Sequence, residues 1–259
     1  MALNPPIRDW RGRRVWIVGG STGIGAATAE RLLAAGARVA VSARSADTLE
    51  ARFARHAESE CLRLPADVLE VATLDRSLAA IVAHWGGLDL AIACAGTYRE
   101  MRAIAPDADA ARAIWRTNFE GCFNVYASCL AQWKAQGGGA LALVSSAAGY
   151  TGLPNSLAYG ASKAALINLA ESLWLDLARH RIAVTLINPG FVDTPLTAQN
   201  RFPMPAIISA EQAAEEILRG FARGAFEIHF PKRFTRSLKL VAMLPHALRF
   251  WCIRRFTGA

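Results

Sequence analysis

A tyrosine and a lysine lie four residues apart in the stretch Tyr159-Gly-Ala-Ser-Lys163. If this stretch is helical, the two side chains share one face, with their Cβ atoms roughly 5–6 Å apart. A free phenol loses its proton near pH ~10, too high for efficient proton transfer at neutral pH, and a neighbouring ammonium stabilises the phenolate. The pair therefore predicts a phenol adapted to acid–base chemistry. A Tyr–Lys pair on an ordinary helical surface is the alternative, and this stretch alone does not exclude it.

Seven short β-rich runs alternate with helix-like stretches and must position such a pair. Continuous apolar runs separated by helices predict a parallel sheet that is covered on both faces. The expected fold class is therefore α/β, with a doubly wound sheet of about seven strands. The runs are 14–19, 38–43, 61–66, 88–93, 140–145, 182–187 and 225–230.

A glycine-rich turn, Gly19-Gly-Ser-Thr-Gly23-Ile-Gly25, directly follows the first run. Glycines at a strand-to-helix turn let the backbone bend sharply and approach a pyrophosphate at the helix N-terminus. Because the turn follows the first strand of a βαβ unit, dinucleotide binding in a Rossmann-type fold is favoured over an ordinary βα turn. The predicted cofactor contacts here are Gly19, Ser21, Thr22, Gly23, Ile24 and Gly25.

The second run ends in Ser42-Ala43-Arg44, where the ribose of a dinucleotide would lie. A carboxylate at this position would bind the 2′-hydroxyl of NAD and repel the 2′-phosphate of NADP. The stretch contains no acid, and the Arg44 guanidinium suits a bidentate phosphate contact. NADP(H) is therefore the predicted cofactor, with NAD(H) as the other option. An arginine that only faces solvent is the simpler explanation.

Further motifs follow the other runs, and together they resemble the classical short-chain dehydrogenases/reductases. The resemblance covers residues 13–195. It departs from the family at 93–96, which reads Ala-Cys-Ala-Gly in place of the common Asn-Asn-Ala-Gly, and at Val18, where a threonine is usual. The motifs are the glycine turn, Asp67-Val68, Ala95-Gly96, Thr117-Asn118, Ser145-Ser146, Tyr159-Gly-Ala-Ser-Lys163 and Asn188-Pro-Gly190.

The resemblance implies a catalytic set. Tyr159 would be the general acid/base, Lys163 would stabilise its phenolate, and Ser146 would orient the substrate oxygen. Asn118 would hold a water in a proton relay, whereas a polar core residue satisfied by nearby backbone is the alternative for it. Ser146 stands thirteen residues before Tyr159, as in the serine–tyrosine pair of the family, and this favours chemistry over a surface pair.

The resemblance also implies the remaining cofactor contacts. Asp67 and Val68 would meet the adenine, and Ala95 and Gly96 would line the ribose. The stretch from Asn188 to Thr194 would surround the nicotinamide, and no metal is implied. The residues expected at the cofactor in addition to the glycine turn and Arg44 are Asp67, Val68, Ala95, Gly96, Tyr159, Lys163, Pro189, Gly190, Val192 and Thr194.

The segment after this stretch is apolar and contains three prolines. We interpret it either as a lid over an apolar carbonyl substrate or as a loop packed on its own core. Its apolar residues are Phe191, Leu196, Phe202, Met204, Ile207 and Ile208.

Composition bounds the class of protein. The chain has 259 residues, 53% of them hydrophobic and 19% charged, enough to bury a large core. Its five cysteines form no C-x-x-C pair or metal-ligand cluster, which is typical of free thiols in a reducing compartment. Residues 1–14 lack the apolar core of a secretory signal, so a cytoplasmic protein is expected. We expect one domain, 1–259, with a Rossmann core over 13–230 and a basic amphipathic extension over 231–259.

The C-terminal extension supplies most of the formal net charge of +8. Apolar residues recur there at helical spacing, interrupted by Pro245, and no run approaches the ~20 apolar residues of a bilayer span. Peripheral contact with an anionic membrane is one interpretation. Cover for the active-site mouth or for a dimer partner is the other, and no motif supports nucleic-acid binding. After Glu227 the chain has no acid, and its basic residues are Lys232, Arg233, Arg236, Lys239, Arg249, Arg254 and Arg255.

These features predict an NADP(H)-dependent oxidoreductase that interconverts a carbonyl and a secondary alcohol on an apolar, lipid-like small molecule. A non-catalytic dinucleotide-binding regulatory or scaffold protein is the rival, although a binder has no need of a tuned phenol. An extended-type epimerase or dehydratase fits less well, because its glycine turn has a different spacing. The family resemblance also implies a homo-oligomer.

Overall fold

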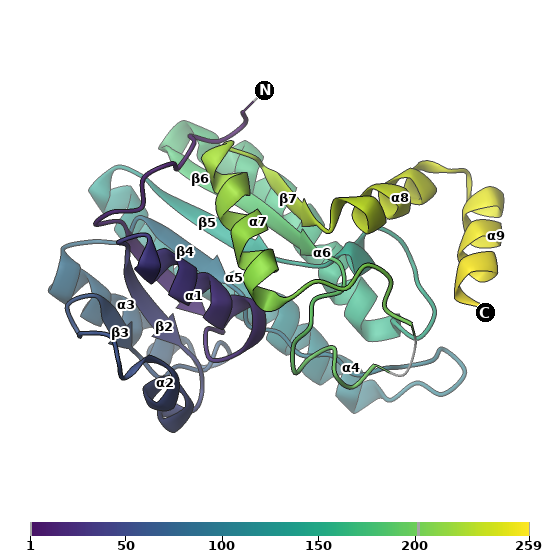
Figure 1. Cartoon of the computed structure of the whole chain (residues 1–259), viewed down its shortest axis with the longest axis horizontal. Coiled ribbons are helices and arrows are strands. Elements are labelled where there is room, and N and C mark those ends of the chain that lie inside the picture. The colour runs from purple at the N-terminus through teal and green to yellow at the C-terminus, as the bar shows by residue number, and fades with distance from the viewer. Residues whose placement is uncertain (1, 201–202, 259) are drawn as a thin grey trace.

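Seven strands form one parallel sheet in the order β3-β2-β1-β4-β5-β6-β7 (Figure 1). The computed structural model describes residues 2–200 and 203–258. The order reverses after β3, so the chain passes from one half of the sheet to the other between β3 and β4. The strands are β1 (Arg14–Val18), β2 (Arg38–Ser42), β3 (Cys61–Arg63), β4 (Leu90–Ala93), β5 (Gly139–Val144), β6 (Ile182–Pro189) and β7 (Glu227–Phe230).

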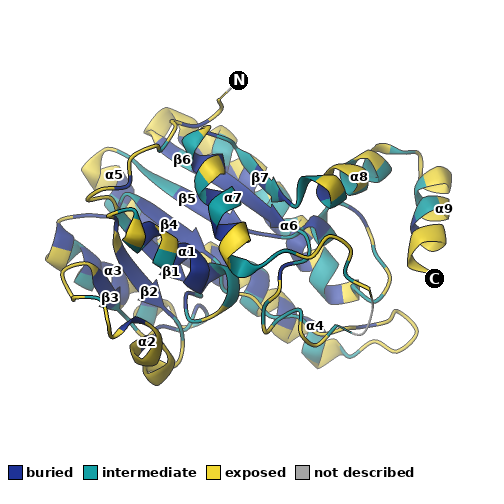
Figure 2. Ribbon diagram, in the orientation of Figure 1, coloured by how far each residue is buried: buried dark blue, intermediate teal, exposed yellow. Residues whose placement is uncertain are grey.

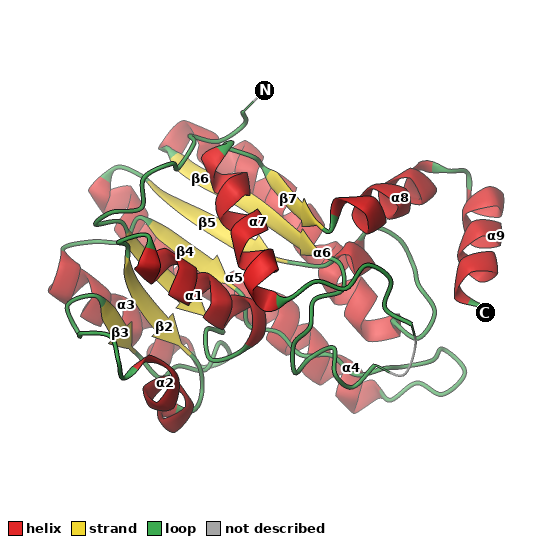
Figure 3. Cartoon of the chain, viewed as in Figure 1, coloured by secondary structure: helices red, strands yellow, loops and turns green. Residues whose placement is uncertain are grey.

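Helices connect the strands and cover both faces of the sheet (Figure 3). A π-helical stretch, η1 (Arg116–Glu120), joins α4 to α5, and two short 3₁₀ turns, η2 (Ala147–Gly149) and η3 (Ala178–His180), flank α6. The α-helices are α1 (Gly23–Ala34), α2 (Ala46–Phe53), α3 (Val71–Trp85), α4 (Ala108–Trp115), α5 (Gly121–Gln136), α6 (Leu157–Leu177), α7 (Ala210–Ala222), α8 (Lys232–Met243) and α9 (His246–Thr257).

Side-chain alternation along β1 divides the core into two layers. Val15 and Ile17 pack with buried residues of α1, α2 and α7, whereas Trp16 and Val18 pack with those of α3, α5 and α6. Figure 1 shows α1 and α7 in front of the sheet and α6 behind it. The predicted α/β, Rossmann-type doubly wound fold is therefore confirmed, and each of the seven expected runs overlaps one strand.

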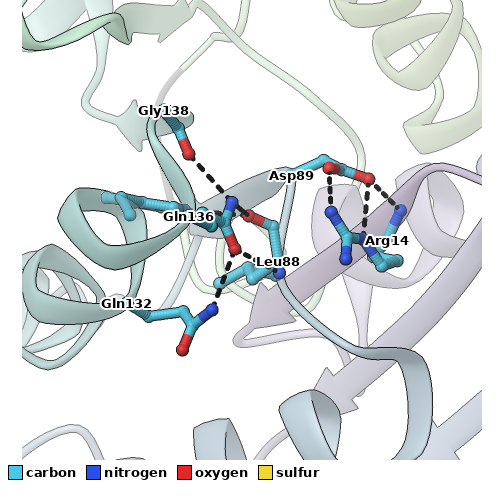
Figure 4. Close-up of polar contacts among 7 residues, drawn as sticks. Arg14, Leu88, Asp89, Gln132, Gln136 and Gly138 are labelled. Carbon is cyan, nitrogen blue, oxygen red and sulfur yellow. Dashed lines mark hydrogen bonds and ion pairs between the residues drawn. The ribbon is translucent and has the colours of Figure 1, made fainter.

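Hydrogen bonds and an ion pair between side chains stabilise the amino edge of the sheet (Figure 4). Asp89 accepts hydrogen bonds from the Arg14 guanidinium, with 2.6 Å between Oδ1 and Nη2, and from the Arg14 main-chain amide at 2.9 Å. Gln136 accepts from the Leu88 amide at 3.2 Å and donates to the Gly138 carbonyl at 2.8 Å. These bonds fix where β4 and β5 begin, which leaves the opposite, carboxyl edge to form a site.

The last two helices extend from the β7 edge of the sheet. Thr235 of α8 is fully buried against the body, and Ile253 is the buried residue of α9, which packs on α8. Figure 2 shows that most of the surface of the two helices is exposed or half-buried. In the described part of the chain, no helix combines the length and apolar character needed to cross a membrane. The division at residue 230 stays a prediction, and β7 ends at Phe230.

Candidate active site

A cavity of about 650 Å³ opens at the carboxyl edge of the sheet. It is lined by the segments that follow β1, β2, β3, β4, β5 and β6, and by the start of α6. A parallel sheet brings these ends together because every strand points the same way, and ligands bind there in open α/β sheets. Every residue predicted at the cofactor or in catalysis lines this cavity, with one exception, Asn118.

The glycine turn is packed so closely that side chains would not fit. Gly19 has φ +92°, and a Cβ there would lie 2.4 Å from the main-chain nitrogen of Ala95. A Cβ on Gly25 would lie 2.1 Å from the Gly19 carbonyl oxygen. The turn can therefore hold its shape only with glycine, and it presents backbone amides at the N-terminus of α1, which suits a pyrophosphate.

Arg44 is exposed and lines the cavity immediately after β2. The next residue, Ser45, begins α2 by accepting the Thr48 amide on its Oγ at 3.2 Å. Among the described residues, no carboxylate forms an ion pair with Arg44. The guanidinium is thus available to an anion in this part of the cavity.

Tyr159 and Lys163 lie in the first two turns of α6, so the predicted i, i+4 pair is on a helix. The Lys163 Nζ is 5.6 Å from the centre of the Tyr159 ring and donates to the Val144 carbonyl oxygen at 2.9 Å. Lys163 is only 4% exposed. Its ammonium is therefore fixed beside the phenol by the end of β5, and the surface-pair alternative does not describe this lysine.

Ser146 follows β5, which ends at Val144, one residue before the end of the predicted run, and Ser146 caps η2 instead. Its Oγ accepts the Ala148 amide at 3.1 Å and donates to the Pro189 carbonyl oxygen at 3.4 Å. The neighbouring Ser145 points away into the fold, where its Oγ donates to the Lys163 carbonyl oxygen at 2.7 Å. Both serines line the cavity with Tyr159 and Lys163, but the Ser145 hydroxyl is taken up by this bond, which leaves Ser146 as the candidate to contact a substrate.

Asn118 is fully buried in the π-helical stretch η1, not in a regular helix. Its Oδ1 accepts the Thr97 amide at 2.7 Å, and its Nδ2 donates to the Thr97 carbonyl and to the Ser162 hydroxyl, both at 3.0 Å. A Cβ on Gly96 would meet both the Asn118 Oδ1, at 3.4 Å, and the Lys163 Nζ, at 3.5 Å. The side chain braces the loop after β4 beside the lysine, and its relay role stays a prediction.

The cavity also contains residues that the sequence analysis missed. Thr97, Leu69 and Thr197 line it, and Tyr98 packs edge-on against Tyr159 with 5.1 Å between ring centres. Burial, with Glu100 and Tyr159 nearby, raises the pKa of Tyr98 to about 12. No local spacing in the sequence indicates Tyr98. Its ring meets that of Tyr159 only because the fold places the loop after β4 next to the start of α6.

The departures from the family pattern leave β1 and β4 joined by backbone. The Cys94 amide donates to the Val18 carbonyl oxygen at 2.8 Å. Burial raises the pKa of the Cys94 thiol to about 11, which keeps it protonated at neutral pH.

The Asp67 side chain, expected at the adenine, accepts a hydrogen bond from the Leu69 amide at 2.9 Å. In the described residues, no cluster of three or more His, Cys, Asp or Glu side chains could hold a metal ion.

The apolar segment after β6 combines features of both interpretations. Val192 is buried and forms an isolated parallel bridge with Ile208, which packs on the core. Leu196 lines the cavity, whereas Ile207 is exposed. The segment is thus anchored near both ends by this bridge, and its first part, as far as Thr197, lines the cavity. Phe202 lies outside the described residues.

The fold and this cavity define a nucleotide-binding oxidoreductase of a known class. The sequence profile of the short chain dehydrogenase family matches residues 13–204, and the chain belongs to that family. The resemblance drawn from the sequence motifs is confirmed.

Two curated relatives and one solved structure are similar over most of the chain. An uncharacterized oxidoreductase of Myxococcus xanthus is 35% identical, over 91% of this chain and 94% of its own. The cis-4-hydroxycyclohexanecarboxylate dehydrogenase of Sinomonas cyclohexanicum is 35% identical, over 80% and 82%. A short chain dehydrogenase from Burkholderia cenocepacia, solved in complex with NADP, has a TM-score of 0.82 and 26% identity, over 94% and 98%.

Proposed function

We propose that this protein is an NADP(H)-dependent oxidoreductase that interconverts a carbonyl and a secondary alcohol on an apolar, lipid-like substrate, with Tyr159 as general acid/base. The observation that carries the proposal is a single cavity lined by the glycine turn and by Ser146, Tyr159 and Lys163. A site that only bound a dinucleotide would have no need of a phenol tuned by a neighbouring ammonium. The described structure thus supports the catalytic function over the binding-only alternative.

A bound nicotinamide dinucleotide supplies or accepts the hydride in such a reaction. Tyr159 then donates its phenolic proton to the carbonyl oxygen, or accepts one from the alcohol in the reverse direction. Ser146 can turn its hydroxyl toward the same oxygen, because its 3.4 Å bond to Pro189 is weak. Lys163 stabilises the phenolate from its fixed position on the Val144 carbonyl.

The choice of NADP(H) rests on the residues around Arg44. Its exposed guanidinium lines the cavity after β2, and no acid stands between Ser42 and Ser45. A ribose 2′-phosphate would find a bidentate donor there and no repelling charge. The Burkholderia cenocepacia relative, solved with NADP, agrees with this preference.

The proposal is tested by Tyr159→Phe on a panel of apolar ketones and secondary alcohols, followed by nicotinamide absorbance. Turnover should fall by about 10²–10⁴, the usual contribution of acid–base catalysis, while the Kd for NADPH stays within about twofold because the ring remains. Tyr126→Phe, on α5 and away from the cavity, is the matched control. Turnover within about tenfold of wild type would show that Tyr159 is not the acid/base.

A further inference from the structure

The basic arm, which we define as α8 and α9 (residues 232–257), presents an unusual surface. It contains seven lysines and arginines and no acid. The Lys239 ammonium forms an ion pair with Glu227 of β7, in the body of the protein. Arg233, Arg236 and Arg255 have no carboxylate partner in the described part of the chain.

The outer face of α8 combines cationic and apolar side chains. Thr235 and Phe234 face the body, since the first is buried and the second stacks on Phe191. Exposed residues recur on the other side at the spacing i, i+3, i+7 and i+10, so they form one stripe along the helix. This stripe comprises Arg233, Arg236, Leu240 and Met243, and the last two are 66% and 82% exposed.

The outer face of α9 has the same character. Ile253 is the buried residue of α9, and Leu248, Trp251 and Arg255 recur at i, i+3 and i+7 on the opposite side of the helix. Leu248 is 55% and Trp251 64% exposed, far more than a tryptophan in an interior. Tryptophan beside arginine on an exposed helix face is typical of segments that lie at a membrane–water interface.

The position of the arm relates it to the cavity. Because β7 runs parallel to the other strands, α8 starts at the carboxyl edge of the sheet, the edge at which the cavity opens. Phe234 stacks on Phe191, one residue beyond the cavity-lining Gly190, with 5.1 Å between ring centres. None of the described arm residues lines the cavity. The arm extends outward from the end of β7, at this same edge of the sheet (Figure 1).

We propose that the basic arm docks the protein on an anionic phospholipid surface, as a pair of interfacial helices. The charge of the arm complements anionic headgroups, while Leu240, Met243, Leu248 and Trp251 bury their side chains at the acyl boundary. Neither helix crosses the bilayer.

Charge also decides against a second copy of the chain as the occupant. In a twofold interface the same patch lies on both subunits, so the arginine stripes of two arms would be brought into one interface. Like charges in such an arrangement repel and cost affinity. An anionic lipid surface removes this repulsion and leaves the same apolar residues to be buried.

The test is sedimentation of the full-length protein with phosphatidylcholine vesicles that either contain or lack about one quarter phosphatidylglycerol. Point variants are used because removing α8 would uncover the buried site around Thr235. Arg233→Glu/Arg236→Glu tests the charge, and Leu248→Ser/Trp251→Ser tests the apolar contact. Arg13→Glu/Arg38→Glu, at the exposed amino end of β1 and β2, and Leu175→Ser, exposed on α6, are the matched controls.

The wild type should bind the anionic vesicles at low salt, bind neutral vesicles at least tenfold more weakly, and lose affinity as salt rises. Each arm pair should lower the affinity at least tenfold, and the controls should change it less than twofold. No binding by the wild type, equal binding to neutral vesicles, or arm variants that bind like the controls would overturn the proposal. A smaller oligomer for Leu248→Ser/Trp251→Ser by size exclusion, without vesicle binding by the wild type, would identify a second copy as the occupant.

Discussion

The cofactor-facing cavity and the basic arm lie at the same edge of the sheet, but they place their polar and apolar groups in opposite ways. Around the cavity, buried polar side chains have partners in the chain, as when Lys163 bonds the Val144 carbonyl and Asn118 bonds Thr97. On the arm, Trp251 and Met243 face outward, and Arg233 and Arg236 have no carboxylate in the described residues. The cavity is therefore organised before any ligand arrives, whereas the arm leaves apolar and cationic side chains exposed.

The rigidity of the cavity is tested by the largest expected effect, that of Gly25→Ala. The new Cβ would lie 2.1 Å from the Gly19 carbonyl oxygen, so the turn must move away from the shape that suits a pyrophosphate. We expect NADPH affinity to fall by roughly a hundredfold, since overpacking of about 3 kcal/mol corresponds to two factors of ten.

The matched control for this change is Gly152→Ala. A Cβ at Gly152 would meet no atom within 4 Å, and that residue lies outside the cavity lining. Isothermal titration of both variants with NADPH measures the difference. Equal affinities would show that the turn adapts, and that the cavity is less rigid than its packing indicates.

Arg44 lines the cavity but is exposed like the residues of the arm. We expect Arg44→Asp to lower the ratio of kcat/KM for NADPH over NADH by roughly 10–100-fold, since a charged hydrogen bond is worth about 1.5–3 kcal/mol. Arg38→Asp, at the other end of β2, makes the same charge change away from the cavity and should leave the ratio unchanged. An unchanged ratio of kcat/KM in both variants would show that Arg44 faces solvent and does not select the cofactor.

Lys239 joins the arm to the body of the protein, since its ammonium pairs with Glu227 of β7, which also accepts from Tyr150 at 2.5 Å and Asn188 at 2.8 Å. Burial by itself would raise the pKa of Glu227, but Lys239 and the two hydrogen bonds outweigh it and hold the pKa below 4.5. Lys239→Met should lower the free energy of unfolding by about 1–2 kcal/mol at pH 7.

The loss of stability in Lys239→Met should depend on pH. A carboxyl with a lowered pKa stabilises the fold above its ordinary pKa and loses that contribution as the pH falls, so the deficit of the variant should shrink below pH 4.5. Urea unfolding at pH 7 and pH 4 measures it, with Lys134→Met on the surface of α5 as the control. A deficit that is the same at both pH values would mean that the Lys239–Glu227 ion pair does not contribute to the stability of the fold.

The smallest effect is expected at His229, whose Nδ1 lies 2.7 Å from the Thr235 hydroxyl of the arm. Burial, with the positive charges of Lys232, Lys239 and Arg236 outweighing Glu227, lowers the pKa of His229 from 6.5 to about 4. The unfolded chain takes up a proton first on acidification, so stability is lost as the pH falls from 6.5 towards 4.

For this half-exposed ring we expect about 1 kcal/mol or less, after allowance for solvent screening. His229→Gln should flatten the loss of stability between pH 6.5 and 4 in thermal unfolding, and the exposed His180→Gln should not. A steep decline that persists in His229→Gln would assign the acid sensitivity to other groups.

Local patterns in the sequence determined the strands, the glycine turn and the Tyr159–Lys163 pair, because strand burial, turn geometry and the spacing of helical neighbours act over a few residues. Helical periodicity likewise predicted the arm, and α8 ends and α9 begins on either side of the interruption at Pro245. The order of the motifs was enough to identify the family, since their spacing reflects the succession of strands and helices.

Only the tertiary structure decided which residues meet across that succession. The π-helical stretch that directs Asn118 to Thr97 and Ser162, the contact of Tyr98 with Tyr159, and the cluster of Glu227 with Tyr150, Asn188 and Lys239 all join residues far apart in the chain. No local propensity encodes such contacts, because they depend on how the packed helices and the parallel sheet bring distant strand ends to one edge. For the same reason, the outward direction of the basic arm follows from the packing of Phe234, Thr235 and Ile253 and not from its charge.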